Sequence, residues 1–467
     1  MVVTLLLSIF AFGQNKQLLF GFKDIPQSVM INPSTTLDND WYVGFPLLSH
    51  IHANVGSSGM SAFDLFADDG TDFNTKLQHL VSRLEDNDFY TVTQQLDIFS
   101  GGFAFGSGVK KDRYLTFGMY LETDVIAYYP KDYAILAFEG NAPHLNRYFD
   151  LSDLNAQGEV VSVFHVGVTK PINKKLTFGA RAKIYSSLFN VRSTNNSGSF
   201  ITEEGQNNFL RHTFDLDLSV NTSGIKSLVD AETSEVSDYI RTLRNRMFFG
   251  GNLGLGIDLG LTYEASDRLT YEASLVDIGF IRHTKDIQNY SINDTYVYEG
   301  INPFFPEITD DQSAEEYWNI VANKFEELFE VDTTHTKYTT WRPLKINAAI
   351  RYKFGKKSTE DCDCFSKDGG YSSMIGGQLY VIGRPKLPQL GLTAFYYRRL
   401  FQGLNVKATY TIDTFSAKNI GFGLSTNIGA LQMFVLADNL LEYQNLAKAR
   451  SASFQLGVNF IFGRNKE

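Results

Sequence analysis

The sequence contains no stretch of about 18 consecutive apolar residues, the length that a helix needs to cross the hydrocarbon core of a membrane. A membrane protein built from helices is therefore excluded. Basic residues are also fewer than acidic ones, 42 against 52, and the formal net charge is -10. Because nucleic acids are held mainly through Lys and Arg contacts to phosphates, this balance argues against a nucleic-acid partner.

Recognisable catalytic motifs are missing as well. The chain has no P-loop, no G-x-S-x-G turn and no H-E-x-x-H pair. Its 8 His residues are scattered, and only His50 and His52 are spaced so that a strand would place both on one face. Two ligands do not make a metal site. The sequence therefore predicts a protein that is not an enzyme and that holds neither a metal nor a cofactor.

Cysteine is almost absent, with only Cys362 and Cys364, separated by one Asp. A disulfide across so short a spacing is strained, and a metal site would need further ligands that the neighbourhood lacks. The polar stretch 356–370 around them is typical of an exposed loop. A structural or incidental role for the two thiols is favoured, and a redox or metal role is the alternative.

The dominant signal that the sequence does contain is apolar residues at every second position. From Leu253 to Tyr263, Leu, Ile and Tyr alternate with Gly, Asp and Thr, so one face of a strand is apolar and the other small or polar. The same pattern recurs at 115–122, 176–185, 214–220, 269–275, 344–352, 390–396, 404–412, 420–424, 431–436 and 454–462. Strands of about ten residues match a tilted crossing of a bilayer.

We therefore predict an all-β protein, a transmembrane antiparallel β-barrel of about 14 strands with short inserted helices, because single-chain bacterial barrels prefer even strand numbers. A soluble β-sandwich is the alternative, but its strands are shorter and its exposed face carries more charge. The final stretch 454–462 is rich in aromatics, places Phe460 on the lipid face and resembles the last strand of outer-membrane barrels.

An export signal is predicted at residues 1–13, which leaves residues 14–467 as the mature barrel. Val2 to Phe12 form a short apolar run, and Ala11-Phe12-Gly13 places small residues where signal peptidase cleaves. The usual Lys or Arg before the run is missing, and the alternative is a buried N-terminal strand. The predicted location is the cell outer membrane of a Gram-negative bacterium, with outer-membrane lipid around the barrel.

Three stretches depart from the strand period and carry apolar residues at helical spacing. They lie near 72–84, 233–247 and 313–331, and the third begins with Ser313 and Glu316, a capping-box pattern. These stretches are predicted to be helices inserted between strands. Packing on the barrel, plugging its lumen or capping one of its mouths are the three roles open to them.

Charged residues fall on the predicted inner face of the strands, and both signs are present. They are compatible with ion pairs between strands, a polar channel or contacts to an inserted plug, and also with a network that only satisfies buried groups. The candidate lumen-facing residues are Glu122, Asp124, Arg181, Lys183, Asp215, Asp217, Asp258, Glu272, Lys345, Arg351 and Lys353.

Short motifs in the first third of the chain resemble a Bacteroidota family of exported barrels of unknown function. They are Leu18-Leu19-Phe20-Gly21-Phe22, Ile25-Pro26-Gln27-Ser28, Asn32-Pro33, Gly56-Ser57-Ser58-Gly59, Asp64-Leu65-Phe66, Ala134-Ile135-Leu136-Ala137, Glu139-Gly140-Asn141 and Leu154-Asn155-Ala156. In general plan the chain is also similar to FadL-like and PorV/PorP-like barrels. The latter likeness implies a link to type IX secretion and gliding. Taken by itself, Asn32-Pro33 predicts a turn.

These observations predict a non-enzymatic outer-membrane barrel that engages a protein partner, such as a secretion-system component, through its lumen and inserted helices. The alternative is a FadL-like transporter of hydrophobic small molecules. A wall of about 14 strands leaves a wide lumen. The stretch 18–33 is a candidate plug, and glycines on one strand leave room for it: Gly250, Gly254, Gly256 and Gly260. The barrel is therefore predicted to be obstructed and to conduct ions poorly.

Overall fold

A computed structural model describes most of the chain. The described residues are 16–106, 111–152, 154–205, 209–227, 236–299, 320, 323, 329–357, 371–401, 403–444 and 448–463. The predicted signal peptide lies outside them, as do Cys362 and Cys364 and most of the predicted helix at 313–331.

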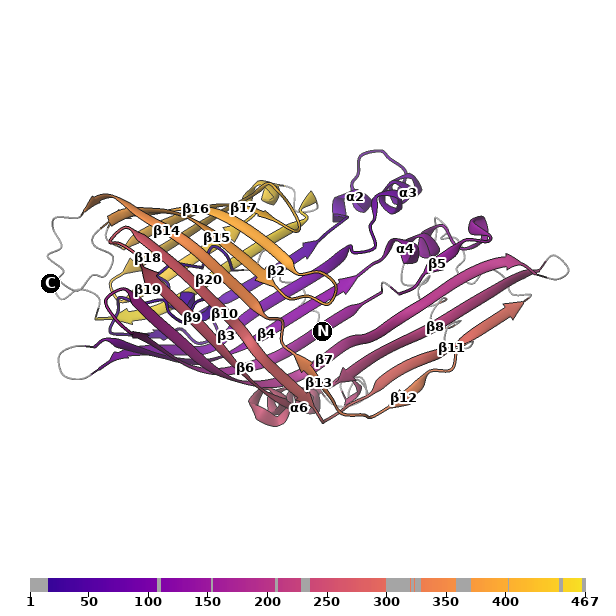
Figure 1. Cartoon of the computed structure of the whole chain (residues 1–467), viewed down its shortest axis with the longest axis horizontal. Helices are drawn as coiled ribbons and strands as arrows, with labels where there is room; N and C mark the ends of the chain where they lie inside the picture. Colours follow the sequence, from indigo (N-terminus) through magenta and orange to yellow (C-terminus); the bar gives the residue numbers. More distant parts are fainter. Residues whose placement is uncertain are drawn as a thin grey trace.

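The strands form one antiparallel sheet that closes into a barrel of 14 strands (Figure 1). The first barrel strand is made of two pieces, β1 and β2, and both pieces pair with β3 on one side and with the last strand, β20, on the other. The barrel strands are β1 (Trp41–Gly44) with β2 (Ile51–Ser57), β3 (Phe89–Phe105), β4 (Arg113–Tyr128), β6 (Ala156–Pro171), β7 (Leu176–Glu204), β9 (Asn252–Glu264), β10 (Leu269–His283), β14 (Lys345–Lys357) with β13 (Tyr338–Trp341), β15 (Tyr371–Ile382), β16 (Gln389–Phe401), β17 (Leu404–Asp413), β18 (Asn419–Ile428), β19 (Leu431–Asp438) and β20 (Ser451–Phe462).

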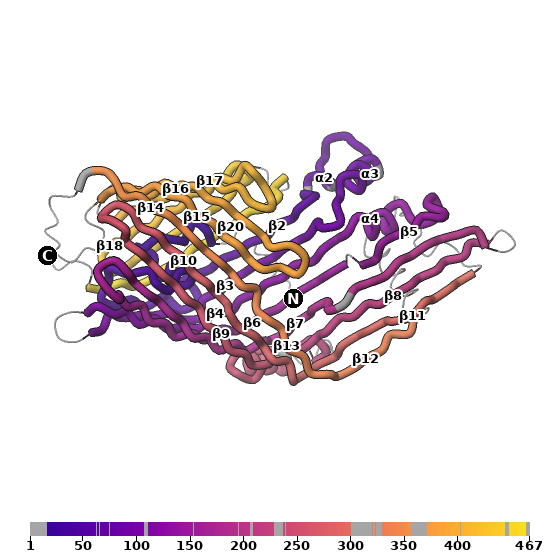
Figure 2. The backbone as a smooth tube through the Cα atoms, in the orientation of Figure 1, coloured from indigo at the N-terminus to yellow at the C-terminus, as the bar shows by residue number. Residues whose placement is uncertain are grey.

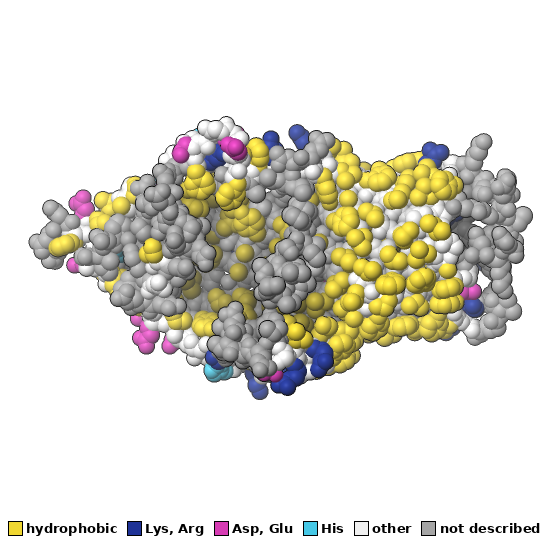
Figure 3. All heavy atoms as spheres, turned by 180° about the vertical axis from the view of Figure 1, so that it is seen from behind, with side chains coloured by type: hydrophobic (Ala, Val, Ile, Leu, Met, Phe, Trp, Pro, Cys, Tyr) yellow, Lys and Arg dark blue, Asp and Glu magenta, His cyan; other side chains and the backbone are white. Residues whose placement is uncertain are grey.

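The barrel wall follows the predicted alternation, with apolar side chains on the outside. On β9, Leu253, Leu255 and Leu261 are 46%, 58% and 43% exposed, whereas Asp258 on the inner face is fully buried. Seen from behind, the barrel carries a continuous apolar belt (Figure 3). A closed sheet with such a belt satisfies every backbone group inside a bilayer. The predicted fold class and the predicted location in the outer membrane are confirmed.

Helices are few and short. They are η1 (Pro26–Met30), α2 (Ala62–Phe66), α3 (Phe73–Arg83), α4 (Lys131–Phe138), η2 (Ala142–His144), α6 (Val236–Asn245), the π-helical turn η5 (Arg246–Gly250) and η6 (Leu440–Gln444). Among the described residues, no helix is long and apolar enough to span a membrane. Of the predicted helices, the first coincides with α3 and the second with α6, while α4 had no counterpart in the sequence prediction.

The two ends of the barrel differ in the length of their connections. At the end where β20 finishes, the turns are short, for example 172–175, 265–268 and 429–430. At the opposite end the connections 58–88, 129–155 and 224–251 are long and carry the helices. Outer-membrane barrels have short periplasmic turns and longer extracellular loops. The helix-bearing end is therefore the extracellular one.

One part of the sheet leaves the barrel at the extracellular end and forms an extension (Figures 1 and 2). The second half of β7 continues beyond the wall and pairs with β5 (Tyr148–Asp150) and with β8 (Leu210–Ser223). Next to β8 lie β11 (Asn289–Glu299) and β12 (Asp332–Thr334). The extension has its own apolar core, in which Phe149, Phe200 and Phe214 are buried with side chains of α4.

Asp215 and Asp217, which the sequence analysis placed in the lumen, lie on β8 in this extension and not in the closed barrel. Asp215 is exposed, and its carboxylate accepts a hydrogen bond from Thr295 Oγ1 at 3.1 Å. Its neighbours Phe214 and Leu216 are the buried ones. On β8 the apolar face packs on a protein core, so the polar face points to solvent instead of to a lumen.

Candidate functional site

The N-terminal segment 16–35 fills the barrel lumen. Leu18, Leu19, Phe20 and Phe22 are fully buried and pack against inner-face side chains of the strands. The segment runs in successive turns and not as a strand, which leaves several of its carbonyl groups without backbone partners. Buried carbonyls need hydrogen-bond donors from elsewhere, and in this lumen cations on the wall supply them.

Lys407 on β17 is the anchor for the first part of this segment. Its side chain is 1% exposed, and Nζ donates to the carbonyl oxygens of Leu18 at 3.0 Å and of Phe20 at 2.7 Å. Arg351 on β14 donates to the carbonyl of Gly21 at 3.4 Å and pairs with Glu272 on β10. The wall therefore recognises the backbone of the segment through charged donors, which form stronger hydrogen bonds than neutral ones.

The second part of the segment is held by β7, β6 and β10. Arg181 on β7 donates to the carbonyl groups of Val29 and Met30, and its guanidinium also pairs with Asp258 at 3.0 Å. Ser274 donates to the carbonyl of Ile31 at 2.7 Å, and Thr169 donates to that of Pro33 at 2.6 Å. Several strands thus hold the segment, and no single strand carries it alone.

Two wall glycines make room for the turn at Asn32-Pro33. A Cβ atom on Gly179 would lie 2.0 Å from the Pro33 carbonyl oxygen, and one on Gly260 would lie 2.4 Å from Asn32 Oδ1. Asn32 Oδ1 accepts hydrogen bonds from the backbone N–H and the hydroxyl of Ser34, at 3.1 and 2.8 Å, which confirms the predicted turn.

The glycines singled out from the sequence divide into two groups. Gly260 contacts the N-terminal segment as expected, whereas Gly254 and Gly256 face Ile281 and Tyr185 of neighbouring strands. Gly250 precedes β9 and lies beside Asn245. The predicted plug is therefore present, but Gly179 on β7, which the sequence analysis did not single out, contributes more of the room for it than three of the four predicted glycines.

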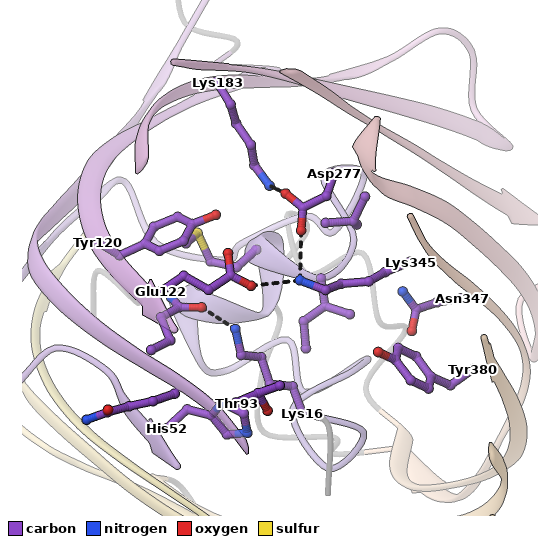
Figure 4. Close-up of a pocket in the computed structure, with 15 residues that line it drawn as sticks. Lys16, His52, Thr93, Tyr120, Glu122, Lys183, Asp277, Lys345, Asn347 and Tyr380 are labelled. Atoms are coloured by element: carbon purple, nitrogen blue, oxygen red, sulfur yellow. Dashed lines mark hydrogen bonds and ion pairs between the residues drawn. The ribbon is translucent and has the colours of Figure 1, made fainter. Parts of the chain in front are cut away.

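Ion pairs join opposite walls of the lumen on the extracellular side of the segment (Figure 4). Arg342, between β13 and β14, pairs with Glu122 on β4 at 2.7 Å and with Glu159 on β6. Lys345 pairs with Glu122 and with Asp277 on β10, both at 2.8 Å. Arg342 and Glu122 are 220 positions apart in the chain. The lumen is therefore closed a second time, by charged side chains.

The ion-pair network extends around the wall, and each of its basic side chains is paired with an acidic one. Lys183 pairs with Asp277 at 2.6 Å and with Asp258 at 2.8 Å, and Arg384 reaches across to Asp124 at 2.6 Å. Removing one partner from a buried ion pair costs several kcal/mol, about 3–5 kcal/mol in measured cases. A balanced and paired set of charges gives the lumen no preference for anions or for cations.

Most of the candidate lumen residues are brought together by the barrel. Glu122, Asp124, Arg181, Lys183, Asp258, Glu272, Lys345 and Arg351 all form ion pairs inside it, and Lys353 on β14 is buried as well. Five further charged residues of the lumen were not predicted from the sequence: Arg342, Arg384, Glu159, Asp277 and Lys407. Arg342 and Arg384 lie in connections, where alternation assigns no face, and Asp277 lies in a bulge of β10 with φ +65°.

The space that the network leaves is small. A cavity of about 40 Å³ lies among Lys16, His52, Tyr120, Glu122, Asp277 and Lys345. Figure 4 shows how these side chains surround it. One water needs about 10–15 Å³ of such volume, so the cavity holds a few waters and no larger solute. Among the described residues, segment 16–35 and the ion pairs of Arg342 and Lys345 lie across the axis of the barrel.

The first barrel strand bulges at one place, between β1 and β2, where Phe45 and Leu48 still bond to Val458 of β20 and Leu47 bonds to Ile98 of β3. Gly44 pairs with Asn459 and Ile51 pairs with Leu456, so the six residues 45–50 stand opposite only two residues of β20. The extra residues bulge outward, and Phe45, Leu47 and Leu48 are 43%, 52% and 41% exposed on the lipid side. Leu47 has φ +63°, an uncommon conformation for a branched side chain.

A buried polar cluster lies directly behind this bulge. Ser49 donates to Asp97 at 3.3 Å, and Gln95 donates to the same carboxylate at 2.8 Å. Lys16, at the start of the described N-terminal segment, donates to Gln95. His50 is fully buried against Gln455 at 3.2 Å. Hydrogen bonds therefore connect the segment that closes the lumen with the bulge in the wall.

The two His residues on one strand face are part of this cluster. The ring centroids of His50 and His52 are 6.4 Å apart. Within the described part of the chain, no group of three or more His, Cys, Asp or Glu side chains is placed to hold a metal ion.

The chain belongs to the Family of unknown function (DUF5723), whose pattern it matches over residues 33–438. None of the curated proteins matches it. Among solved structures it is similar to the Pseudomonas putida toluene transporter TodX, with 9% identity, 96% of each chain covered and a TM-score of 0.38. It is also similar to the Ralstonia pickettii toluene transporter TbuX, with 10% identity, 98% of this chain and 100% of that one covered, and a TM-score of 0.42.

A FadL homologue of Pseudomonas aeruginosa gives comparable values, with 10% identity, 97% of this chain and 100% of that one covered, and a TM-score of 0.41. Scores of this size describe a shared barrel plan and carry no argument about what this chain transports or binds.

Proposed function

We propose that this member of the DUF5723 family is a gated outer-membrane conduit for small hydrophobic solutes. The observation that carries the proposal is the contrast between the axis of the barrel and its wall. The axis is closed twice, by segment 16–35 and by the ion pairs of Arg342 and Lys345. In the wall, in contrast, regular strand pairing gives way to the bulge at 45–50 within the apolar belt.

The chemistry of the two routes indicates the class of solute. A polar solute on the axis would have to displace paired, buried charges, and the balanced network offers it no compensating attraction. An apolar solute that passes through the wall at 45–50 meets Phe45, Leu47 and Leu48 and then membrane lipid. Transfer of apolar surface into such surroundings is favourable by about 25 cal/mol per Å². The geometry therefore fits a hydrophobic solute better than an ion or a sugar.

The gate is the N-terminal segment. Lys16 links it to Gln95 and Asp97 behind the bulge, and Lys407 and Arg181 hold its carbonyl groups. A rearrangement of the segment would therefore act on both the lumen and the bulged strand.

A deletion of residues 46–49 tests the route directly. Phe45 already bonds to Val458, and His50 and Ile51 would then follow it opposite Gly457 and Leu456. Four residues is an even number, so every side chain keeps its face. We expect a folded, heat-modifiable barrel in which uptake of a radiolabelled monoaromatic hydrocarbon by whole cells falls to the level of cells without the protein.

Leu47→Ala is the matched control, because it keeps the bulge and removes only one exposed side chain. It should leave uptake within about twofold of the original protein. Undiminished uptake through a correctly assembled deletion variant would contradict the lateral route.

A second candidate function is engagement of a protein partner, for example a type IX secretion or gliding component. The observation that favours it is the extension, which projects beyond the barrel on strands β7, β8 and β11. Sheets that project in this way present backbone and side chains to other proteins. Affinity purification from detergent extracts after mild cross-linking is the test. Recovery of the barrel by itself would count against this function.

A further inference from the structure

One segment lies on the outside of the barrel at the extracellular edge of the apolar belt, and neither proposed function uses it. It consists of α6 (Val236–Asn245) and the π-helical turn η5 (Arg246–Gly250). Arg246 attaches it to the barrel, because its guanidinium donates to the carbonyl of Gly224 at 2.6 Å and pairs with Asp286 at 2.7 Å. The segment therefore has a fixed position on the wall.

This attachment places two aromatic side chains on the lipid-facing wall. The Phe249 ring stacks on Phe164 of β6 with centroids 4.1 Å apart, and Phe248 lies 6.4 Å from the same ring. Phe248 and Phe249 are nevertheless 52% and 45% exposed. Phe249 has φ +66°, which costs a residue with a side chain about 1–3 kcal/mol. A strained backbone that presents two half-exposed Phe rings indicates a binding surface.

Three basic residues lie on this segment or on the chain beside β9. Arg244, Arg282 and Lys285 are exposed, and none of the three forms an ion pair with any residue that the structure describes. Arg282 on β10 lies beside Phe280, the last apolar residue on the outer face of that strand. Lys285 donates to the carbonyl of Gly250 at 2.8 Å, which ties it to the same turn.

A shallow groove of about 500 Å³ is lined by Arg244, Asn245, Phe248 and Gly250, so it brings one basic and one aromatic side chain together. In the space-filling view, Lys and Arg side chains gather at the lower edge of the molecule, beside α6, where the apolar belt ends (Figure 3). Half of the surface is therefore suited to an anion and the adjoining half to an acyl chain.

We infer that this surface binds a phosphate-bearing lipid of the outer leaflet, with its phosphate at Arg244, Arg282 and Lys285 and an acyl chain along Phe248 and Phe249. Charge complementarity and continuity with the lipid-facing belt carry the inference. Amphipathic helices with basic and aromatic residues lie in membrane interfaces, and basic residues there attract anionic headgroups. A soluble anion would use the cations alone and would not need the exposed rings.

The test measures lipid bound to the full-length protein after purification from outer membranes in mild detergent. Native mass spectrometry and phosphorus assay compare the original protein with the triple variant Arg244→Gln, Arg282→Gln and Lys285→Gln. We expect one phosphorylated glycolipid to be retained by the original protein and its retention to fall about tenfold or more in the variant, since three cations are removed.

A matched control removes three exposed basic residues away from the groove, through Lys174→Gln, Lys175→Gln and Arg211→Gln. It should retain lipid like the original protein, because the net charge changes equally and the groove is untouched. A second measurement adds purified lipid A, intact or dephosphorylated, to delipidated protein. Only the intact form should bind well.

Two results would overturn the inference. Equal retention in the triple variant and the control would mean that the basic groups do not hold the lipid. Equal binding of intact and dephosphorylated lipid A would mean that the contact is apolar only. Phe248→Ser provides an independent check, because it should weaken binding of intact lipid A while leaving the barrel heat-modifiable.

Discussion

The two halves of β7 follow the same alternation but in opposite senses. In the barrel half, Phe178 and Ile184 are 39% and 42% exposed on the outside, whereas Arg181 and Lys183 are buried inside. In the extension, Phe200 is fully buried and its partner strand β8 turns Asp215 outward. The medium differs, because lipid surrounds the barrel and water surrounds the extension. Alternation thus separates two faces but does not say which one is buried.

The largest effect, on ion conductance, should come from removing the N-terminal segment that fills the barrel. Deletion of residues 18–33 takes away Leu18, Leu19, Phe20 and Phe22 and leaves Lys407 and Arg181 without their carbonyl partners. We expect an almost silent planar bilayer with the complete protein and a large, steady ohmic current with the deletion. The extension keeps its own apolar core and should remain folded. A complete protein that already conducts like a diffusion porin would contradict the plugged lumen.

Phe200→Ala should act on the extension alone. The ring stacks on Phe214 with centroids 4.3 Å apart and is fully buried, so its removal should destabilise the extension by about 3–5 kcal/mol. Hydrogen exchange should rise in β8 and β11, while heat-modifiable mobility of the barrel stays unchanged. Coupled loss of both would show that the extension and the barrel form one cooperative unit.

Ile257→Arg tests the lipid face of the barrel half. Ile257 lies at the middle of β9 and is 41% exposed, and a basic residue on the lipid face near the midplane costs about 2–4 kcal/mol. Slower assembly and a lower folded fraction in lipid vesicles are expected. Ile257→Leu serves as the control, with no measurable change. Normal assembly of the Arg variant would mean that this face does not contact lipid.

Asp215→Asn should have the smallest effect. Asp215 is exposed on the extension and accepts one hydrogen bond, from Thr295, which an amide oxygen can also accept. We expect a change in unfolding free energy within about 0.5 kcal/mol, as for other surface positions. The same substitution at Asp258, which is fully buried between Arg181 and Lys183, should be clearly destabilising. Equal effects at the two positions would contradict the different surroundings assigned to them.

The sequence by itself determined the barrel. Alternation at β9 and at β20 predicted strands long enough to cross a bilayer, and the sum of such strands predicted a closed wall of the observed size. Asn32-Pro33 predicted a turn. These inferences succeed because they depend on period, length and local backbone preferences, which neighbouring residues specify.

Only the tertiary structure decided which charged residues form ion pairs and which face of a strand is exposed to water. Arg342 reaches Glu122 because closure of the sheet brings β13 and β4 to facing sides of one lumen. Asp277 joins them through a bulge that breaks the period. Asp215 lies outside the lumen because its strand, β8, pairs with the half of β7 that continues beyond the membrane. That half is surrounded by water and not by lipid. Side-chain alternation is a property of one strand, whereas the medium on either side of it is a property of the whole fold.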